Sequence, residues 1–282
     1  MPIYEQGYRP YEARSPLRRV RFWPITREAL RLLLSRRAFL FLLIPCWVPF
    51  LARCVQIWVV TQFPQAGRLL PVDGRLFGEF LNQQLGLALI LTTFGGAGLI
   101  ANDLRTGAIL VYLSRPLTRR DYVIGKLSVL LALNLFVTLA PALLLYGVGI
   151  ALAPEQYLKL DLFWIAPAIV TQACLVSASL SLLALAVSAL SKSARVAGLS
   201  FFGLIAGLEM ARGVLRNVFD ARWATLLSLQ ADIRGVSNAL FEITPRRWEA
   251  VGPLEASLVL AAVAGACLLL LRARVRAVEI VQ

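Results

Sequence analysis

The stretch that decides the fold of this chain is Leu127–Leu145, LSVLLALNLFVTLAPALLL, in which apolar residues occupy every face of a helix. A second stretch of the same kind is Leu175–Leu190, LVSASLSLLALAVSAL. A helix of roughly 20 apolar residues spans the ~30 Å hydrocarbon core of a bilayer. A transmembrane β-strand would alternate apolar and polar residues over about ten positions, and neither stretch alternates. The sequence therefore predicts a helical membrane protein.

The composition of the whole chain points the same way. Of its 282 residues, 59% are hydrophobic and 16% are charged, and the mean hydropathy is +0.71. An ordinary soluble domain is about half apolar and about a quarter charged. We predict an all-α polytopic membrane protein with six transmembrane helices, at Phe39–Val60, Gln84–Ala101, Leu127–Leu152, Phe163–Leu190, Val196–Met210 and Leu254–Leu271. The first span contains Pro45 and Pro49, so we expect it to be kinked and packed in the bundle rather than bathed in lipid.

The segment before the first span is polar and rich in arginine. It lacks the compact apolar core and small-residue cleavage site of a signal peptide, so we expect it to be retained. Leucines recur there at helical spacing beside four arginines, Arg27, Arg31, Arg36 and Arg37. Such a basic amphipathic helix lies in the headgroup layer with its arginines on anionic lipid, and the alternative is a frayed extension of the first span. We divide the chain into a basic cytoplasmic tail with an interfacial helix, residues 1–37, and a six-helix membrane domain, residues 38–282.

Loop charge predicts the orientation of the spans. An even number of spans places both termini on one side, and that side carries more basic residues, so both termini are expected in the cytoplasm. The segment Ala211–Gly252 conflicts with this topology, because it holds six arginines and would lie outside. Apolar residues recur there at helical spacing and predict an outer interfacial or re-entrant helix, at Leu226, Leu229, Ile233, Val236 and Leu240.

Several classes of function are disfavoured by the residue types present. The chain has no histidine, which removes the commonest general base and the commonest neutral metal ligand. Its four cysteines lie in apolar runs without the spacing of a zinc site, so we interpret them as small buried hydrophobes. The net charge of +13 comes from basic residues that flank apolar runs, which is typical of membrane topology rather than of nucleic-acid binding. We expect no metal site, no catalytic residue and no nucleic-acid partner.

The connection between the second and third spans, ANDLRTGAILVYLSRPLTRRDYVIGK at 101–126, carries the functional signal. Asp103 marks where the second span leaves the hydrocarbon, and a helical stripe continues beyond it to Tyr112. Pro116 ends that helix, because the residue before a proline is pushed out of the α region. Thr118 and Asp121 have the spacing of a capping box and start a new helix. The prediction is a short charged elbow fixed to two membrane helices.

The residues of this elbow are Asp103, Arg105, Gly107, Leu113, Ser114, Arg115, Pro116, Leu117, Arg119, Tyr122, Gly125 and Lys126. Their order resembles the cytoplasmic motif of type-2 ATP-binding-cassette (ABC) permeases, and is most similar to the multi-copper-enzyme-maturation and sodium/drug-export branch. The resemblance implies the permease subunit of an ATP-driven exporter in the bacterial inner membrane, with the elbow as a coupling helix. It also implies a second permease copy, identical or related, and two copies of a separate ABC ATPase.

ATP and Mg are expected on that partner subunit rather than on this chain. The sequence has no G-x-x-x-x-G-K-[ST] loop, and the pair Gly125-Lys126 lacks both the upstream glycine and the following hydroxyl residue. The cargo is not identified by any motif. Two other classes stay open: an ATP-independent channel or membrane scaffold, and an intramembrane enzyme. The second has only Ser200 as a nucleophile, without a histidine or an intramembrane lysine to act as its base.

Ionisable and amide side chains inside the spans are candidates for function. Arg53 and Glu209 lie at similar depth by residue counting, and an unpaired charge in hydrocarbon costs several kcal/mol. We predict that they form an ion pair or face one polar vestibule, and the alternative is that each snorkels alone to the interface. Asn134, Thr138 and Gln172 line a transport pathway or form interhelical hydrogen bonds.

Overall fold

The computed structural model of the chain describes residues 22–63, 65, 73–109, 118–152, 163–219, 222–244 and 251–274. The described residues form helices and turns and contain no strand, which confirms the all-α prediction. Six helices are long and apolar enough to cross a membrane, as the sequence predicted. The first consists of α2 (Arg37–Leu43), η1 (Pro45–Trp47) and α3 (Val48–Gln62), and the others are α4 (Gly74–Thr106), α6 (Arg119–Leu152), α8 (Ile165–Ser188), α9 (Ala194–Phe219) and α11 (Pro253–Arg274).

The second and third spans are longer than hydropathy indicated. Hydropathy detects only the part of a helix that sits in hydrocarbon, whereas backbone hydrogen bonding continues into the polar layers. The start of α6 is capped reciprocally, as predicted: the Thr118 amide donates to Asp121 Oδ2 at 3.0 Å, and the Asp121 amide donates to Thr118 Oγ1 at 3.2 Å. This capping box satisfies two amides that the first turn of a helix leaves without intrahelical partners.

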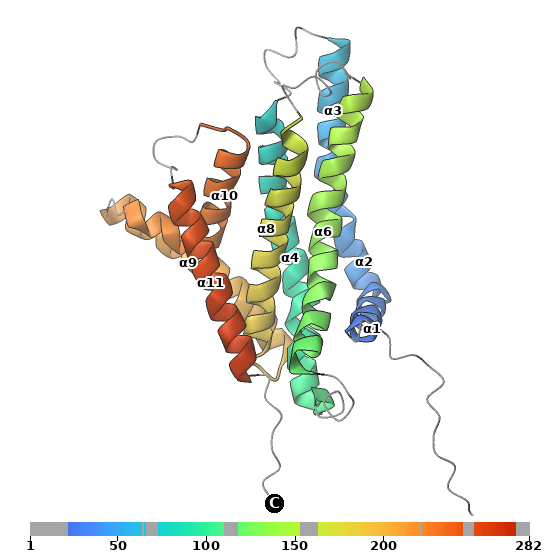
Figure 1. Cartoon of the computed structure of the whole chain (residues 1–282), viewed down its shortest axis with the longest axis vertical. Helices are drawn as coiled ribbons and strands as arrows, with labels where there is room; N and C mark the ends of the chain where they lie inside the picture. The colour runs from blue at the N-terminus through green and yellow to red at the C-terminus, as the bar shows by residue number, and fades with distance from the viewer. Residues whose placement is uncertain are drawn as a thin grey trace, which may run out of the picture.

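The core of the bundle is formed by α4, α6 and α8, and α9 packs on α4 (Figure 1). The close approach depends on small residues. A Cβ added at Gly96 of α4 would lie 3.1 Å from Ala184 Cβ on α8 and 3.2 Å from Leu130 Cδ1 on α6. Without a side chain at this position the three helices come together closely, which is a common way for membrane helices to associate.

The first span is kinked at Pro45, where the helix becomes a 3₁₀ turn, and this confirms the predicted kink. The expectation that it is packed rather than lipid-exposed is wrong for the single chain. Only 11% of its most apolar window is buried, and side chains such as Phe41 and Leu51 are exposed. The physical reason is that the span packs against the rest of the chain through one face only. On that face Gln84 of α4 donates a hydrogen bond to the Cys46 carbonyl at 2.9 Å, and the side chains on the other faces are exposed.

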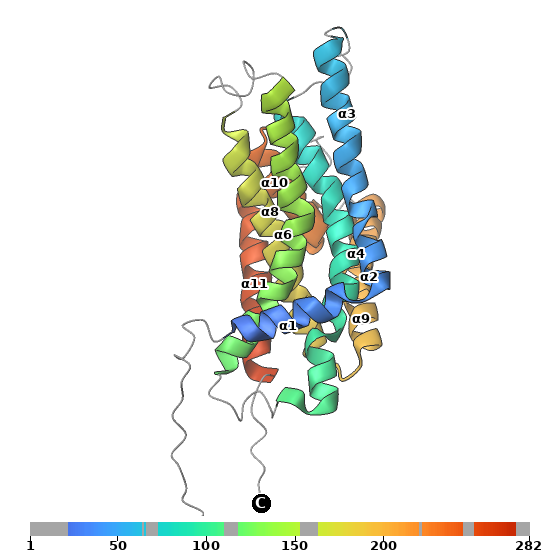
Figure 2. The ribbon, with the colours of Figure 1, turned by 90° about the vertical axis from the view of Figure 1, so that its right-hand side faces the viewer.

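A separate helix, α1 (Trp23–Leu34), crosses the spans at one end of the bundle (Figure 2). It is not a frayed extension of the first span, because Arg36 between α1 and α2 has an extended backbone. The side chains of Ile25 and Leu33 are buried, whereas Arg27, Arg31, Arg36 and Arg37 are exposed. This two-sided pattern is the one expected of a helix that lies at an interface.

The long segment after α9 folds into η3 (Arg222–Leu227) and α10 (Leu229–Leu240). The helix predicted here from apolar spacing is present, and Ser228 caps it by accepting a hydrogen bond from the Ala231 amide at 3.1 Å. Helix α10 turns back beside α8 and α11 instead of lying across the bundle (Figure 1). The two geometries expected for this helix, interfacial and re-entrant, both stay predictions.

Candidate functional site

Three residues of the predicted elbow meet where α4 ends and α6 begins. Lys126 Nζ lies 2.7 Å from Asp103 Oδ2, and the Tyr122 hydroxyl donates to the same oxygen at 2.8 Å. Lys126 Nζ also lies 5.7 Å from the centroid of the Tyr122 ring. The side chains of Lys126 and Asp103 are only 7% and 16% exposed, and Tyr122 is fully buried. We call these three residues the junction cluster.

The junction cluster joins α4 and α6 into one unit. A buried ion pair adds little net stability compared with apolar packing, but removing one partner costs about 3–5 kcal/mol because a charge is left uncompensated. The two helices therefore cannot separate at this end without exposing or stranding a charge. The segment that connects α4 and α6 starts and ends within a few turns of the cluster. A displacement of this segment would therefore move both helices together.

Glycines shape both sides of the junction. Helix α4 ends at Gly107, whose φ of 70° is in the left-handed region that favours glycine. The predicted continuous helix from the second span to Tyr112 is therefore wrong, because the chain turns at Gly107 before helical structure resumes at Ala108. On α6, a Cβ at Gly125 would lie 3.1 Å from Ile25 of α1, and Thr26 Oγ1 donates to the Gly125 carbonyl at 3.0 Å.

The remaining elbow residues divide into two groups. Arg105 and Arg119 are exposed on either side of the connection. The other predicted coupling residues lie outside the described residues, namely Leu113, Ser114, Arg115, Pro116 and Leu117. The structure thus brings together Asp103, Tyr122 and Lys126 and leaves the tip of the elbow undescribed.

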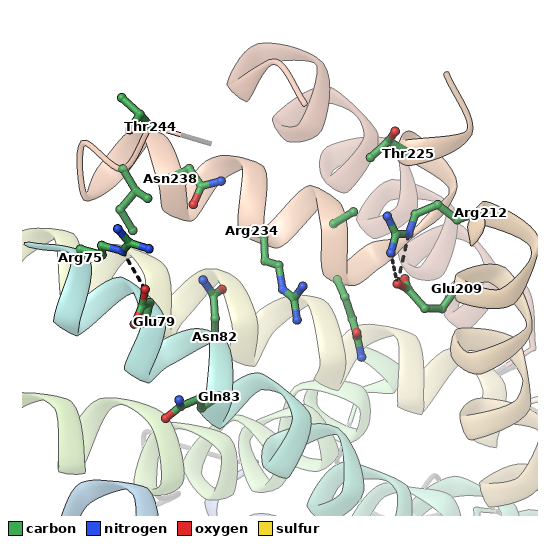
Figure 3. Close-up of a pocket in the computed structure, with 13 residues that line it drawn as sticks. Arg75, Glu79, Asn82, Gln83, Glu209, Arg212, Thr225, Arg234, Asn238 and Thr244 are labelled. Carbon is green, nitrogen blue, oxygen red and sulfur yellow. Dashed lines mark hydrogen bonds and ion pairs between the residues drawn. The ribbon is translucent and has the colours of Figure 1, made fainter. Parts of the chain in front are cut away.

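A polar cavity of about 440 Å³ lies near the opposite end of the bundle, between α4, α9 and α10 (Figure 3). Arginines and glutamates from all three helices line it. Arg75 Nε donates to Glu79 Oε1 at 2.8 Å, and Glu209 accepts from Arg212 Nε at 3.1 Å. Arg234 enters the cavity from α10 (Figure 3). Among the described lining residues, three arginines face two glutamates, so the cavity suits polar or anionic groups more than apolar ones.

The predicted ion pair between Arg53 and Glu209 is wrong. Arg53 lies 3.6 Å from Glu79 and donates to Gln56 at 2.8 Å, while Glu209 pairs with Arg212 and accepts a hydrogen bond from Ser228. The reason is the packing order, since α3 lies against α4 and α6 and Glu209 faces the turn before α10. Glu209 lines the polar cavity, and Arg53 reaches the edge of that cavity through Glu79.

The intramembrane amides take part in hydrogen bonds between helices. Thr92 on α4 donates to Asn134 Oδ1 at 2.9 Å, and Asn134 Nδ2 donates to Ser181 on α8 at 3.2 Å. Thr138 donates to the Asn134 carbonyl within α6 at 2.8 Å, and Gln172 donates to the Ile233 carbonyl of α10 at 3.3 Å. All of these side chains are buried, and Gln172 Oε1 has no hydrogen-bond partner within the described parts of the chain. The interhelical hydrogen bonds are present, and a role in a transport pathway stays a prediction.

Sequence reasoning missed two polar features. Glu79 fell outside the predicted second span, although the spacing of Arg75 and Glu79 is a helical i,i+4 pair that could have extended it. Ser188 on α8 donates to the Ala97 carbonyl at 2.9 Å and accepts from the amides of Ile100 and Ala101 on α4. No local pattern signals this contact, because all three partners are backbone groups of a helix that is distant in the sequence.

Comparison with known proteins agrees with this architecture. A family model described as "ABC-2 family transporter protein" matches residues 85–261, more than half of the chain. The chain therefore belongs to the ABC-2 family of transporter membrane proteins, as the elbow motif indicated. No curated protein matches the chain. Family membership makes this multi-pass protein the membrane component of an ABC transporter rather than an enzyme by itself, and it implies an ABC ATPase partner in general.

Proposed function

We propose that this chain is the permease subunit of an ATP-driven exporter that works by alternating access. Two permease copies, identical or related, would associate with two ATPase subunits that hold ATP and Mg. The membrane is the bacterial inner membrane, with both termini in the cytoplasm. The elbow motif resembles that of multi-copper-enzyme-maturation and sodium/drug-export permeases, which favours this branch of the family. The observation that carries the proposal is the junction cluster, which lies beside the segment that resembles a coupling helix.

The mechanical argument follows from positions along the two helices. Asp103 lies about 6 Å along α4 from the turn at Gly107, and Lys126 lies about 12 Å along α6 from the cap at Thr118, at 1.5 Å per residue. A coupling segment that enters a groove of the ATPase is thus anchored to both helices within two to three turns. When the ATPase subunits close, the segment moves, and the ion pair transmits the movement to α4 and α6 as one body.

The packed core then carries the movement across the membrane. Helix α8 is held to α4 by Ser188 and to α6 by the hydrogen bond between Asn134 and Ser181. A rigid shift of α4 and α6 therefore takes α8 with it. The first span, α9 and α11 are less buried than α4 and α8 within one chain, so these three spans are the ones free to change their contacts.

The test is co-purification with a candidate ABC ATPase from the same genome, followed by measurement of ATP hydrolysis in lipid. The permease should associate with the ATPase and change its hydrolysis rate several-fold. Arg119→Ala, at an exposed elbow position, should weaken this coupling while leaving the fold intact, and Arg274→Ala at the end of α11 is the matched control. If the ATPase neither associates nor responds, the chain is an ATP-independent channel or scaffold.

A further inference from the structure

A second depression, larger and mostly apolar, is lined by residues of α1, α4 and α9 and by Asp103 and Lys126 of the junction cluster. Its volume is about 800 Å³. Small residues of α4, including Gly95 and Gly98, make room along it, and its walls are large apolar side chains. Phe94 and Leu199 among them are 68% and 74% exposed. We call this depression the basic-ended groove, for the reason given next.

One end of the groove carries two arginines. Arg36 follows α1, and Arg195 is in the first turn of α9. Both side chains are exposed, and neither has a hydrogen bond or an ion pair within the described parts of the chain. Asp103 is the one acidic side chain among the described residues of the lining, and Lys126 already pairs with it at 2.7 Å. This end therefore has two uncompensated positive charges.

The groove has the length of one lipid leaflet. Along α4 it extends from Asn102 to Ile90, roughly 18 Å at 1.5 Å per residue. Half of the hydrocarbon core is roughly 15 Å thick. Arg36 comes just after α1, the amphipathic helix that crosses the end of the bundle (Figure 2), and Arg195 comes just after Ala194, which packs beside Gly98 of α4. The charged end of the groove is therefore at headgroup depth. The apolar remainder points toward the middle of the membrane.

We propose that the basic-ended groove binds one anionic phospholipid from the leaflet on the side of α1. The phosphate lies between Arg36 and Arg195, and an acyl chain runs along Phe94 and Phe202. Basic pockets between transmembrane helices are a known way to recognise anionic headgroups. That this is the cytoplasmic leaflet rests on the orientation in the proposed function, whereas the binding itself does not. A second copy of the chain fits the groove less well, because an isologous contact brings the same unpaired arginines together.

The experiment compares lipid binding by the full chain reconstituted in phosphatidylcholine vesicles that contain a spin-labelled probe. The probe is phosphatidylglycerol in one arm and phosphatidylcholine in the other. The wild-type chain should immobilise the anionic probe about thirtyfold more strongly, the factor that corresponds to two basic residues near a membrane surface. Arg36→Gln combined with Arg195→Gln should abolish this preference. Arg31→Gln combined with Arg37→Gln removes the same charge from the same end of the molecule, away from the groove lining, and should retain it.

Further arms of the experiment distinguish an anionic lipid from other occupants of the groove. Leu199→Trp, at an exposed wall position, narrows the groove and should reduce binding of the anionic lipid while both arginines remain. The proposal is overturned if inorganic phosphate displaces the probe, if the two double variants behave alike, or if the groove variants change only the association of permease copies. If the chain does not couple to the ATPase but retains its preference for the anionic lipid, the proposed function is contradicted and the lipid site is still supported.

Discussion

Replacement of Lys126 by methionine tests the junction cluster most directly. Methionine retains most of the length of the side chain but removes the ammonium group, so the Asp103 carboxylate keeps the Tyr122 hydroxyl and loses its ion pair. Asp103 is 16% exposed, so solvent compensates it only weakly. Leaving one member of a buried pair unpaired costs about 3–5 kcal/mol, and we expect the lower end of that range.

The measurement is thermal unfolding of the purified protein in a mild detergent, monitored by circular dichroism. At roughly 2 °C per kcal/mol for a chain of this size, Lys126→Met should lower the Tm by about 6 °C or more. Asp103→Asn should also destabilise the protein. The double variant has no buried charge at this place, so its loss should be smaller than the sum of the two single losses by about 1–3 kcal/mol.

The chain provides a matched control in the pair of Arg75 and Glu79. Their side chains are 61% and 45% exposed, and exposed ion pairs contribute little to stability because water screens the charges. Arg75→Gln should therefore change the Tm only slightly. If Lys126→Met has no larger effect than this control, or if the double variant loses the full sum, the junction cluster does not hold α4 and α6 together.

Three other predictions concern α10, α4 and α6. Burial raises the pKa of Asp232 from 3.8 to about 7, so the folded state favours the protonated form and loses stability as pH rises from about 4 to about 7. Asp232→Asn should remove this pH dependence and raise stability above pH 7, by at most about 4 kcal/mol, measured as the Tm across that range. Gly96→Ala should lower the Tm by a few degrees because of its 3.1 Å contact, whereas Gly86→Ala, with no atom within 4 Å, should be neutral or stabilising by up to about 1 kcal/mol. Thr118→Ala should cost about 1 kcal/mol through the lost cap, with reduced amide protection in the first turn of α6 by hydrogen exchange.

Specific results would contradict each of these expectations. A Tm of the wild-type protein that is flat between about pH 4 and 7 means that Asp232 is not held in its neutral form. If alanine at Gly96 and alanine at Gly86 change the Tm equally, the close packing of α4, α6 and α8 does not require glycine at position 96. Unchanged hydrogen exchange in Thr118→Ala means that α6 starts without help from its capping box.

The features that the sequence determined by itself are local ones. Six apolar segments, the break at Pro45, the capping box at Thr118 and the helix at 229–240 were all predicted, and the structure contains them. The reason is that lipid requires every backbone group to be satisfied inside its own helix. The elbow motif likewise indicated the family before any tertiary contact was known, because it is a continuous stretch of chain.

Partnership between distant polar groups was decided by the tertiary structure. Similar depth suggested Glu209 as the partner of Arg53, but depth says nothing about which helices are neighbours. The neighbours of α3 are α6 and α4, and α4 carries Glu79. The bond between Lys126 and Asp103, and the groove between α1, α4 and α9, depend in the same way on the lateral order of the helices. Hydropathy sets how far a residue lies along the membrane normal, whereas side-chain packing sets what lies beside it.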